Sequence, residues 1–170
     1  MNAKATKAAT PAADGARASG QYLSFFLDGQ EYGTDILRVR EIKGWDSVTR
    51  VPHCPKHVLG VINLRGAIVP VVDLRILFNL ERVPYDATTV IVVVHVPAER
   101  GERTVGVVVD AVADVYNVMT DGIKPAPEAL GSVEKVFVKG LADQDGKLLI
   151  LLDIERLVTT SVLGDTRAVA

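Results

Sequence analysis

The chain has 170 residues with a formal net charge of −2 at pH 7, and its 48% apolar and 24% charged residues describe a globular, aliphatic-rich protein. This balance, without runs of basic residues among aromatics, argues against a nucleic-acid-binding surface, and no apolar run approaches the about 18 residues that span a bilayer. The single cysteine, Cys54, rules out an internal disulfide and favours a reducing, cytoplasmic location.

Three segments follow along the chain. Residues 1–19 are rich in Ala, Thr, Gly and Pro without apolar periodicity, which predicts a flexible tail. This tail lacks the continuous apolar stretch of a secretory signal. Residues 20–163 are expected to fold, and residues 164–170 are expected to form a short C-terminal tail.

The first half predicts short strands separated by turn signals. Asp28-Gly29 marks a hairpin, and Asp35 is a plausible N-cap for a short turn over residues 36–39. Pro70 lies inside a β-branched run, where a missing backbone donor indicates a sheet edge or a bulge. The expected elements are strands at 22–27, 31–34, 40–44, 48–51, 60–64 and 67–72, a helical turn at 55–58, and a helix at 74–80.

The second half follows a similar plan. Its apolar runs are again of strand length and are bounded by polar turns with glycine. Pro125 and Pro127 indicate an extended loop before the last hairpin. The expected elements are strands at 90–96, 104–109, 112–118, 136–142 and 147–152, a helical turn at 128–131, and a helix from 154 to about 163.

The two halves are an internal repeat. The stretch GVINLRGAIVPVVDLRILF (60–78) aligns with GLADQDGKLLILLDIERLV (140–158) without a gap, at an offset of 80. Gly33 and Gly106 align at an offset of 73, which places a seven-residue insertion in the loop around 124–134. We therefore expect two copies of a unit of about 70 residues, each a small barrel of about five strands, which pack together and share apolar surface.

The matched residues have structural explanations. Gly66 and Gly146 stand at hairpin turns, where positive φ favours glycine. Gly60 and Gly140 precede strands, where a missing Cβ permits a bend or a close backbone approach. The matched aspartates, Asp73 and Asp153, are each expected to cap a helix N-terminus.

No catalytic motif is present in the sequence. It contains neither a phosphate-binding glycine loop, nor a dinucleotide fingerprint, nor a zinc-protease or serine-hydrolase motif. His53, Cys54 and His57 lie close together, but a closed zinc site needs four ligands and no second group of ligands appears. We therefore expect no catalytic residue, no metal and no cofactor.

The differences between the copies point to a binding surface. Arg65, in Asn63-Leu64-Arg65-Gly66, stands at a hairpin where the other copy has Asp145. The segment ILRVREI (36–42) alternates charged and apolar residues, so that Ile36, Val39 and Ile42 are expected to line a groove for a partner helix with valines of the second unit. The alternative is that these aliphatic residues simply fill the core between the units.

Five sequence blocks resemble one family. EYGTDILRVREI, GVINLRGAIVPVVDLR, VGVVVDAVADV, IKPAPE and LLILLDIERLV occur in family-like order and spacing. They resemble CheW, the coupling protein family of bacterial chemotaxis, from Gln21 to about Leu163. The resemblance implies an all-β fold with short helices, made of two intertwined, SH3-like, five-stranded β-barrels and a C-terminal helix. Barrel 1 is expected at about 33–83 and barrel 2 at about 88–153, with terminal segments crossing between them.

The resemblance also implies a non-catalytic adaptor without a cofactor. Its partners would be the helical tips of methyl-accepting chemoreceptors, the regulatory domain of the histidine kinase CheA and further CheW copies, at receptor arrays on the cytoplasmic side of the membrane. The residues matching the family's receptor-contact positions are Val39, Glu41, Gly60 and Arg65. With the groove residues, the expected receptor site comprises Ile36, Val39, Glu41, Ile42, Gly60, Asn63 and Arg65, and the expected kinase or ring contacts are Thr49, Arg50, Val51, Gly140, Leu141 and Asp143.

Glu41 and Arg65 are expected to form an ion pair across the first barrel. Two other functions compete with the adaptor: a regulatory domain from a larger kinase or from an adaptor–receiver fusion, and a small-barrel nucleic-acid-binding protein. The sequence has no resemblance to a kinase core or a receiver domain, and sparse aromatics and near-neutral charge disfavour nucleic-acid binding.

Overall fold

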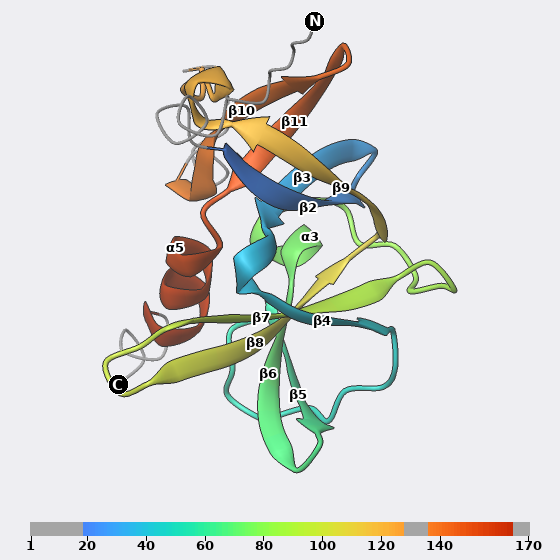
Figure 1. Cartoon of the computed structure of the whole chain (residues 1–170). Coiled ribbons are helices and arrows are strands. Elements are labelled where there is room, and N and C mark those ends of the chain that lie inside the picture. The colour runs from blue at the N-terminus through green and yellow to red at the C-terminus, as the bar shows by residue number, and fades with distance from the viewer. Residues whose placement is uncertain (1–18, 128–135, 165–170) are drawn as a thin grey trace, which may run out of the picture.

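The computed structural model describes residues 19–127 and 136–164 (Figure 1). The two expected tails lie almost entirely outside these residues, as do the helical turn predicted at 128–131 and most of the seven-residue insertion.

Within the described residues, ten strands form two five-stranded sheets. One sheet has the order β10-β11-β3-β2-β9 and the other β4-β7-β8-β6-β5. The strands are β2 (Ser19–Leu27), β3 (Gln30–Asp35), β4 (Val39–Gly44), β5 (Val58–Leu64), β6 (Ala67–Asp73), β7 (Val90–Pro97), β8 (Glu102–Val109), β9 (Ala111–Met119), β10 (Val138–Gln144) and β11 (Lys147–Leu152). The helical segments are η1 (Ile36–Arg38), α3 (Leu74–Leu77), η2 (Thr120–Gly122), α5 (Ile154–Val158) and η3 (Thr159–Gly164).

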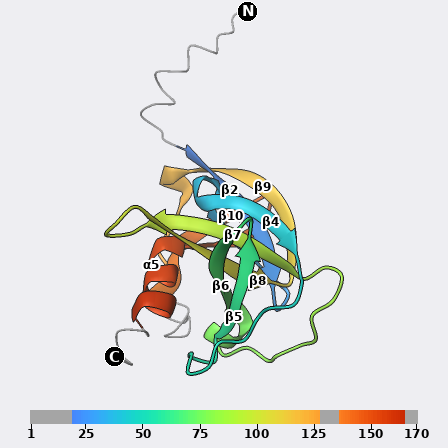
Figure 2. The ribbon, with the colours of Figure 1, turned by 90° about the horizontal axis from the view of Figure 1, so that it is seen from below.

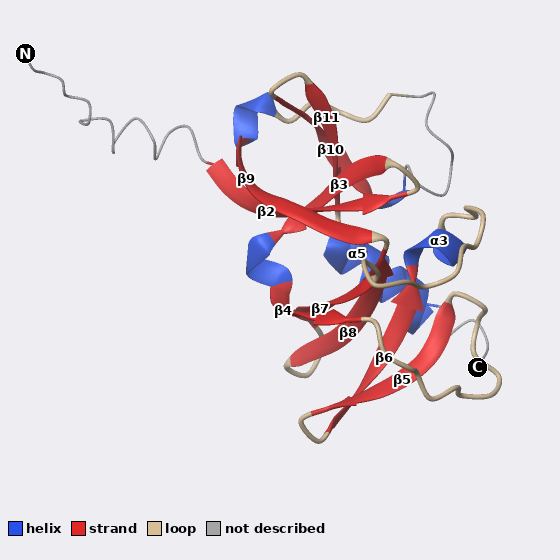
Figure 3. Cartoon of the chain, turned by 90° about the vertical axis from the view of Figure 1, so that its right-hand side faces the viewer, coloured by secondary structure: helices blue, strands red, loops and turns tan. Residues whose placement is uncertain are grey.

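Each sheet combines strands from both repeats, so the expected barrel bounds of 33–83 and 88–153 are wrong. The first barrel consists of β4 to β8, and the second consists of β2 and β3 together with β9 to β11 (Figures 1 and 3). The reason is the parallel pairing of β6 with β8 and of β11 with β3, which joins the last hairpin of one repeat to the first hairpin of the other. The chain therefore crosses between the barrels at η1 and again at Asp110.

The matched glycines of the two parallel pairs explain this exchange. Gly106 lies opposite Val71, and Gly33 lies opposite Leu151. A Cβ at position 106 would approach Ile91 Cγ2 to 2.7 Å, and one at position 33 would approach Leu151 Cδ2 to 3.1 Å. Glycine at these positions therefore allows the two hairpins to pair closely without displacing core side chains.

Three hydrophobic clusters account for the core of the described chain. Alternate residues of a strand face opposite sides of its sheet. On β7, Ile91 and Val93 accordingly fill the first barrel, while Val92 and Val94 face a larger cluster between the barrels. On β11, Leu149 and Leu151 fill the second barrel, while Ile150 and Leu152 join the larger cluster. The expected sharing of apolar surface between the two units is thus confirmed.

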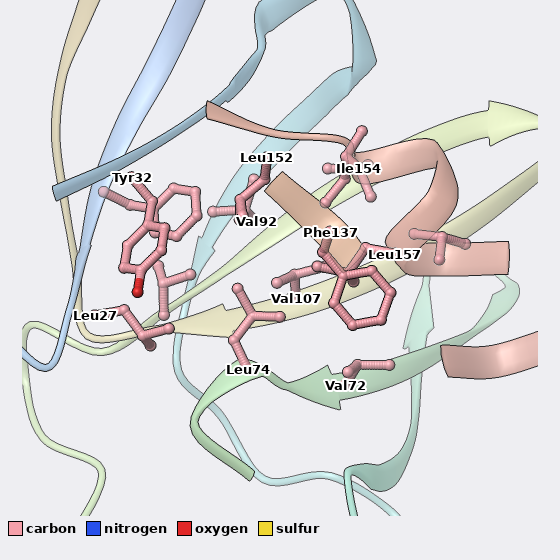
Figure 4. Packing of buried hydrophobic residues seen from close by; sticks show 14 of the residues in the cluster. Leu27, Tyr32, Val72, Leu74, Val92, Val107, Phe137, Leu152, Ile154 and Leu157 are labelled. Atoms are coloured by element: carbon pink, nitrogen blue, oxygen red, sulfur yellow. The ribbon is translucent and has the colours of Figure 1, made fainter. Parts of the chain in front are cut away.

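The larger cluster lies at the joint between the barrels (Figure 4). Leu74 of α3 and Leu157 of α5 both pack into it. The Tyr32 and Phe78 rings lie 6.1 Å apart, and those of Phe78 and Phe137 lie 6.2 Å apart, so aromatic contacts connect the second barrel to the segment after α3. In Figure 2 the red α5 lies beside the strands of the first barrel, and it contacts β7.

Local differences from expectation lie in proline-rich segments, at helix ends, and at the strand predicted for 136–142, which is β10 at Val138–Gln144 and is preceded by helical residues 136 and 137. The strand predicted at 48–51 is reduced to one bridge between Thr49 and Val61, and the helical turn predicted at 55–58 is an irregular turn, because the prolines of this loop donate no backbone hydrogen bonds. α3 ends at Leu77, three residues earlier than predicted. β6 lies inside its sheet, but its pairing with β8 begins at Val71, so Pro70 lacks a strand neighbour only on that side.

Candidate functional site

The predicted ion pair between Glu41 and Arg65 is present. Arg65 Nη1 donates to Glu41 Oε2, and the Arg65 side chain is 75% exposed while that of Glu41 is 24% exposed. Glu41 lies on β4, and Arg65 lies at the turn between β5 and β6. Because β4 and β5 are the two edges of their sheet, the pair closes the first barrel at the surface.

The turn that carries Arg65 is built by its neighbours. Arg65 and Gly66 both have positive φ, of +52° and +90°. Asn63 Oδ1 accepts a hydrogen bond of 2.8 Å from Gly66 N. Asn63, a predicted groove residue, therefore shapes the hairpin. The second barrel repeats this turn, with Asp143 Oδ1 accepting from Gly146 N at 2.9 Å.

The two barrels differ in charge at this place. The repeat puts Asp114 at the position of Glu41 and Asp145 at the position of Arg65. Asp145 has the same backbone conformation as Arg65, with a φ of +54°. Two acids cannot form an ion pair, so the pair of cation and carboxylate distinguishes the first barrel from the second.

Gly60 contributes backbone spacing to the predicted receptor site. It is buried, and a Cβ on it would lie 2.0 Å from the Thr49 carbonyl oxygen. Thr49 and Val61 exchange backbone hydrogen bonds of 2.9 and 2.8 Å, which hold the chain against β5. Gly140 has the same role in the second barrel, where a Cβ would lie 2.8 Å from Lys124 O.

The aliphatic residues of the predicted groove separate into two groups. Ile36 and Val39 are half-buried and pack against the cluster between the barrels, so they belong partly to the core. Ile42 on β4 is 45% exposed. The structure adds Leu37 on η1, which is 77% exposed and was missed by the sequence analysis. Figure 3 shows η1 between the two sheets. On one side of it lie β2 and β9, and on the other side lie β4 and β7.

Sequence reasoning also missed Val115. It lies on β9, is 43% exposed, and is the repeat counterpart of Ile42. The alignment of the halves was the signal that would have found it. We call exposed Leu37, Ile42 and Arg65, together with half-buried Glu41, the docking surface.

The predicted kinase or ring contacts lie on different barrels. Thr49, Arg50 and Val51 are exposed in the segment that follows β4 in the first barrel. Of the second group, Gly140 is buried and Leu141 is half-buried on β10. The second group also includes Asp143, the turn residue described above. The strand order thus keeps the groups apart, each at the β5 or β10 edge of its own sheet.

A buried arginine ties the barrels together. Arg75 of α3 donates from Nε and Nη2 to the two carboxylate oxygens of Asp110, at 2.9 and 2.7 Å, and from Nη1 to Glu81 O at 2.6 Å. Asp110 also accepts from Asp28 N at 2.9 Å. Arg75 follows β6 of the first barrel, Asp28 lies in the turn between β2 and β3 of the second barrel, and Asp110 lies where the chain crosses between them. The network therefore connects the two barrels.

The network also sets the charge states. The hydrogen bond from its guanidinium to Asp110 raises the pKa of Arg75 above its ordinary value. Partial burial opposes ionisation of Asp110, but the hydrogen bonds from Arg75 and the Asp28 amide outweigh it, so the pKa of Asp110 is lowered.

The crossing at η1 carries a longer and more exposed ion pair, in which the helix supplies the acid and not the base. Arg38 of η1 lies 3.4 Å from Glu155 of α5, with side chains that are 32% and 51% exposed. Glu155 is the repeat counterpart of Arg75. The residue on the helix is therefore a base, Arg75, at the first crossing described and an acid, Glu155, at this one. The joint is thus held firmly on one side and weakly on the other.

In the histidine-rich segment, His57 makes a structural contact. His57 Nε2 lies 2.8 Å from Ser161 O, which ties the loop to η3. Among the described residues, no group of three or more His, Cys, Asp or Glu side chains is arranged to hold a metal. No helix in this part of the chain has the length and apolar character to cross a membrane.

Comparison with known proteins identifies the family. The sequence profile of the CheW-like domain matches residues 21–162. The chain belongs to the CheW family. This membership accounts for the five sequence blocks and for the two barrels with exchanged strands, and it confirms the resemblance on which the fold class was predicted.

Individual CheW relatives match over most of their length. The chain is 42% identical to a protein of Klebsiella aerogenes named chemotaxis protein CheW, over 85% of this chain and 84% of the relative. It is 35% identical to a chemotaxis protein CheW of Rhizobium meliloti, over 88% and 92%. The crystal structure of the scaffolding protein TtCheW from Thermoanaerobacter tengcongensis superimposes with a TM-score of 0.71 at 31% identity, covering 79% of this chain and 89% of that one. These names denote chemotaxis and scaffolding proteins, not enzymes.

Proposed function

We propose that the protein is a non-catalytic adaptor that couples the cytoplasmic tips of chemoreceptors to the histidine kinase CheA. The observation that carries this proposal is the match to the CheW-like domain over residues 21–162, together with relatives named for chemotaxis and scaffolding. It would work in the cytoplasm, recruited to receptor arrays. Its partners would be receptor tips, the CheA regulatory domain and further CheW copies, and it would need no cofactor.

The docking surface suits a helical partner. Leu37 on η1 and Ile42 on β4 offer exposed apolar side chains, and the pair of Glu41 and Arg65 adds a charged rim. An amphipathic helix recognises such a surface by placing its apolar face on the aliphatic residues and its polar edge against the charges. Burial of about 25 cal/mol per Å² is largely offset by ordering and desolvation, so each contact is expected to be weak, with avidity supplied by the array.

The kinase and ring contacts are proposed at the edges of the barrels. Thr49, Arg50 and Val51 would serve the first barrel, and Gly140, Leu141 and Asp143 the second. Exposed Ile68 and Leu148, 65% and 51% exposed, lie opposite Asn63 and Asp143 in the two equivalent hairpins and add an apolar residue to each.

Reconstitution tests the adaptor role. The protein is added to receptor fragments and CheA, and phosphorylation of CheA is measured with and without receptor. We expect receptor-dependent kinase output for the wild type and at least a tenfold lower apparent receptor affinity for Arg65→Ala, a loss of about 1.4 kcal/mol. The melting temperature should barely change, because an exposed ion pair stabilises a protein by about 0–1 kcal/mol.

The matched control is Asp145→Ala. It changes the equivalent turn residue of the second barrel, with the same positive φ, and should leave receptor coupling intact. Wild-type protein that leaves kinase output independent of receptor would count against the adaptor role. A large fall in melting temperature for Arg65→Ala would instead make Arg65 a scaffold residue.

A further inference from the structure

A hollow of about 430 Å³ on the first barrel has a charge pattern that the proposed adaptor function does not explain, although Arg50 and Val51 in its wall are also proposed kinase or ring contacts. It is formed by the loop between β4 and β5, with Arg82 from the segment after α3. Its charged side chains are Arg50, Lys56 and Arg82, with His53 beside them, and its lining includes no Asp or Glu. Three side chains that are cationic at neutral pH therefore line one small volume.

Within the described residues, neither Arg50 nor Lys56 forms an ion pair. Arg82 neighbours the Tyr85 hydroxyl, which donates to the Asp73 carboxylate, so one acidic group lies beyond that hydroxyl. A second hollow, of about 230 Å³, also contains Lys56 and Arg82 in its wall, so these two cations stand between two concavities. Such an arrangement attracts an anion.

The loop that forms the hollow is held at both ends. Thr49 exchanges two backbone hydrogen bonds with Val61, and Asp73 N donates to His57 O at 2.8 Å. Between these anchors, Val58 N donates to Pro55 O at 3.0 Å, and His53 has a positive φ of +63°. These backbone hydrogen bonds hold the loop in a conformation that includes one non-glycine residue at positive φ.

The segment that carries Arg82 is fixed as well. Glu81 O accepts the 2.6 Å hydrogen bond from Arg75 on one side of it. On the other side, Tyr85 packs on Trp45 with ring centroids 4.0 Å apart and donates from its hydroxyl to Asp73 Oδ2 at 2.5 Å. The positive groups of the hollow thus sit on two anchored segments, which reduces the ordering cost of binding.

We propose that this hollow binds a small phosphate ester, such as a nucleoside diphosphate. Guanidinium forks match phosphate oxygens in pairs, and the Lys56 ammonium adds a point charge. The apolar walls formed by Val51, Val58 and Leu59 would face the organic part of the ligand. The volume lies within the range of about 300–1,000 Å³ that small-molecule sites occupy.

The single cysteine provides a direct readout. Cys54 is exposed and lines the hollow, so a bound ligand would shield it. We would measure the rate of Cys54 alkylation by iodoacetamide, a neutral reagent, at increasing concentrations of ADP, pyrophosphate and inorganic phosphate, with calorimetry for the dissociation constants. We expect saturable protection, with ADP binding most tightly, then pyrophosphate, then phosphate.

The variant Arg50→Ala/Lys56→Ala/Arg82→Ala should raise the ADP dissociation constant at least tenfold. The matched control, Arg100→Ala/Lys124→Ala/Lys147→Ala, removes three exposed cations elsewhere and should bind ADP like the wild type. Because all six side chains are exposed, both variants should fold, and melting curves check this. A rise in salt concentration should weaken the binding of ADP to the wild type, because salt screens the exposed charges. This measurement needs no variant.

Two outcomes would overturn the proposal. One is ADP affinity that is the same for the wild type and the hollow variant, since it would place the anion elsewhere. The other is equal affinity for ADP and pyrophosphate, since it would exclude a role for the apolar walls and hence an ester ligand. Neither outcome bears on receptor coupling, which is measured separately.

Discussion

At the scale of single residues, Gly60 shows how a side chain can be excluded by a neighbouring backbone. Its φ is +150°, and a Cβ would lie 2.0 Å from Thr49 O and 2.9 Å from Val48 Cγ1. The carbonyl cannot retreat, because it accepts the hydrogen bond from Val61 N that closes the barrel edge. Glycine is therefore needed here for packing as well as for backbone conformation.

Gly60→Ala should lower the free energy of unfolding by at least about 3 kcal/mol, since it adds both a steric clash and backbone strain. Urea denaturation would measure the change. Gly122→Ala is the control, because its Cβ would meet nothing within 4 Å, and it should cost no more than about 0.5 kcal/mol. A loss below about 1 kcal/mol for Gly60→Ala would contradict the expected clash.

The raised pKa of the Tyr85 hydroxyl leads us to expect a loss of stability at alkaline pH. Burial, and then the hydrogen bond to Asp73, raise the pKa of Tyr85 to about 12, from its ordinary value of 10.0. Between these values the folded state binds more protons than the unfolded state, so the free energy of unfolding falls as the pH rises from about 10 to about 12. Tyr85→Phe has no proton to release here and should show a shallower fall in urea denaturation. An equally steep fall in both proteins would show that other groups cause it.

At the scale of elements, the helices α3 and α5 both begin at an N-capping aspartate, but the two aspartates have different surroundings. Asp73 accepts from Arg75 N at 2.9 Å, and Asp153 accepts from Arg156 N at 3.0 Å. Both predicted caps are thus confirmed. Asp73 is buried and also accepts from the Tyr85 hydroxyl, whereas Asp153 has only the capping role among these interactions.

Asp153→Ala should therefore cost about 1 kcal/mol, the usual value for a lost N-cap. Asp73→Ala should cost about 2 to 3 kcal/mol, because it also leaves the Tyr85 hydroxyl unsatisfied. Chemical denaturation of the two variants side by side measures the difference. Equal losses would mean that the Tyr85 contact adds nothing to stability.

At the scale of the whole molecule, the two crossings between the barrels are stabilised by ion pairs of different strength. At one crossing the nearly buried Arg75 guanidinium interacts with three residues, Asp110, Glu81 and Asp28, whereas Arg38 and Glu155 meet at the surface of the other crossing. Removing one partner of a buried pair leaves a charge without compensation, which costs far more than opening an exposed pair.

Arg75→Ala should accordingly lower the free energy of unfolding by about 2 kcal/mol or more, since half-buried Asp110 loses its charged partner. Arg38→Ala, the control at the other crossing, should cost about 1 kcal/mol or less. Denaturant unfolding gives both values. If the two variants were equally stable, the proposed difference between the crossings would be wrong.

The sequence by itself determined the repeat, the class of fold and most strands, because alternating apolar residues, turn glycines and helix-capping aspartates act over a few neighbouring positions. It also placed Glu41 opposite Arg65 through the family resemblance. Only the tertiary structure decided which hairpins share a sheet, since the parallel pairing of Val71 with Gly106 joins residues far apart in the chain. For the same reason, the tie between Arg75 and Asp110 and the gathering of Arg50, Lys56 and Arg82 around one hollow depend on contacts that no local pattern records.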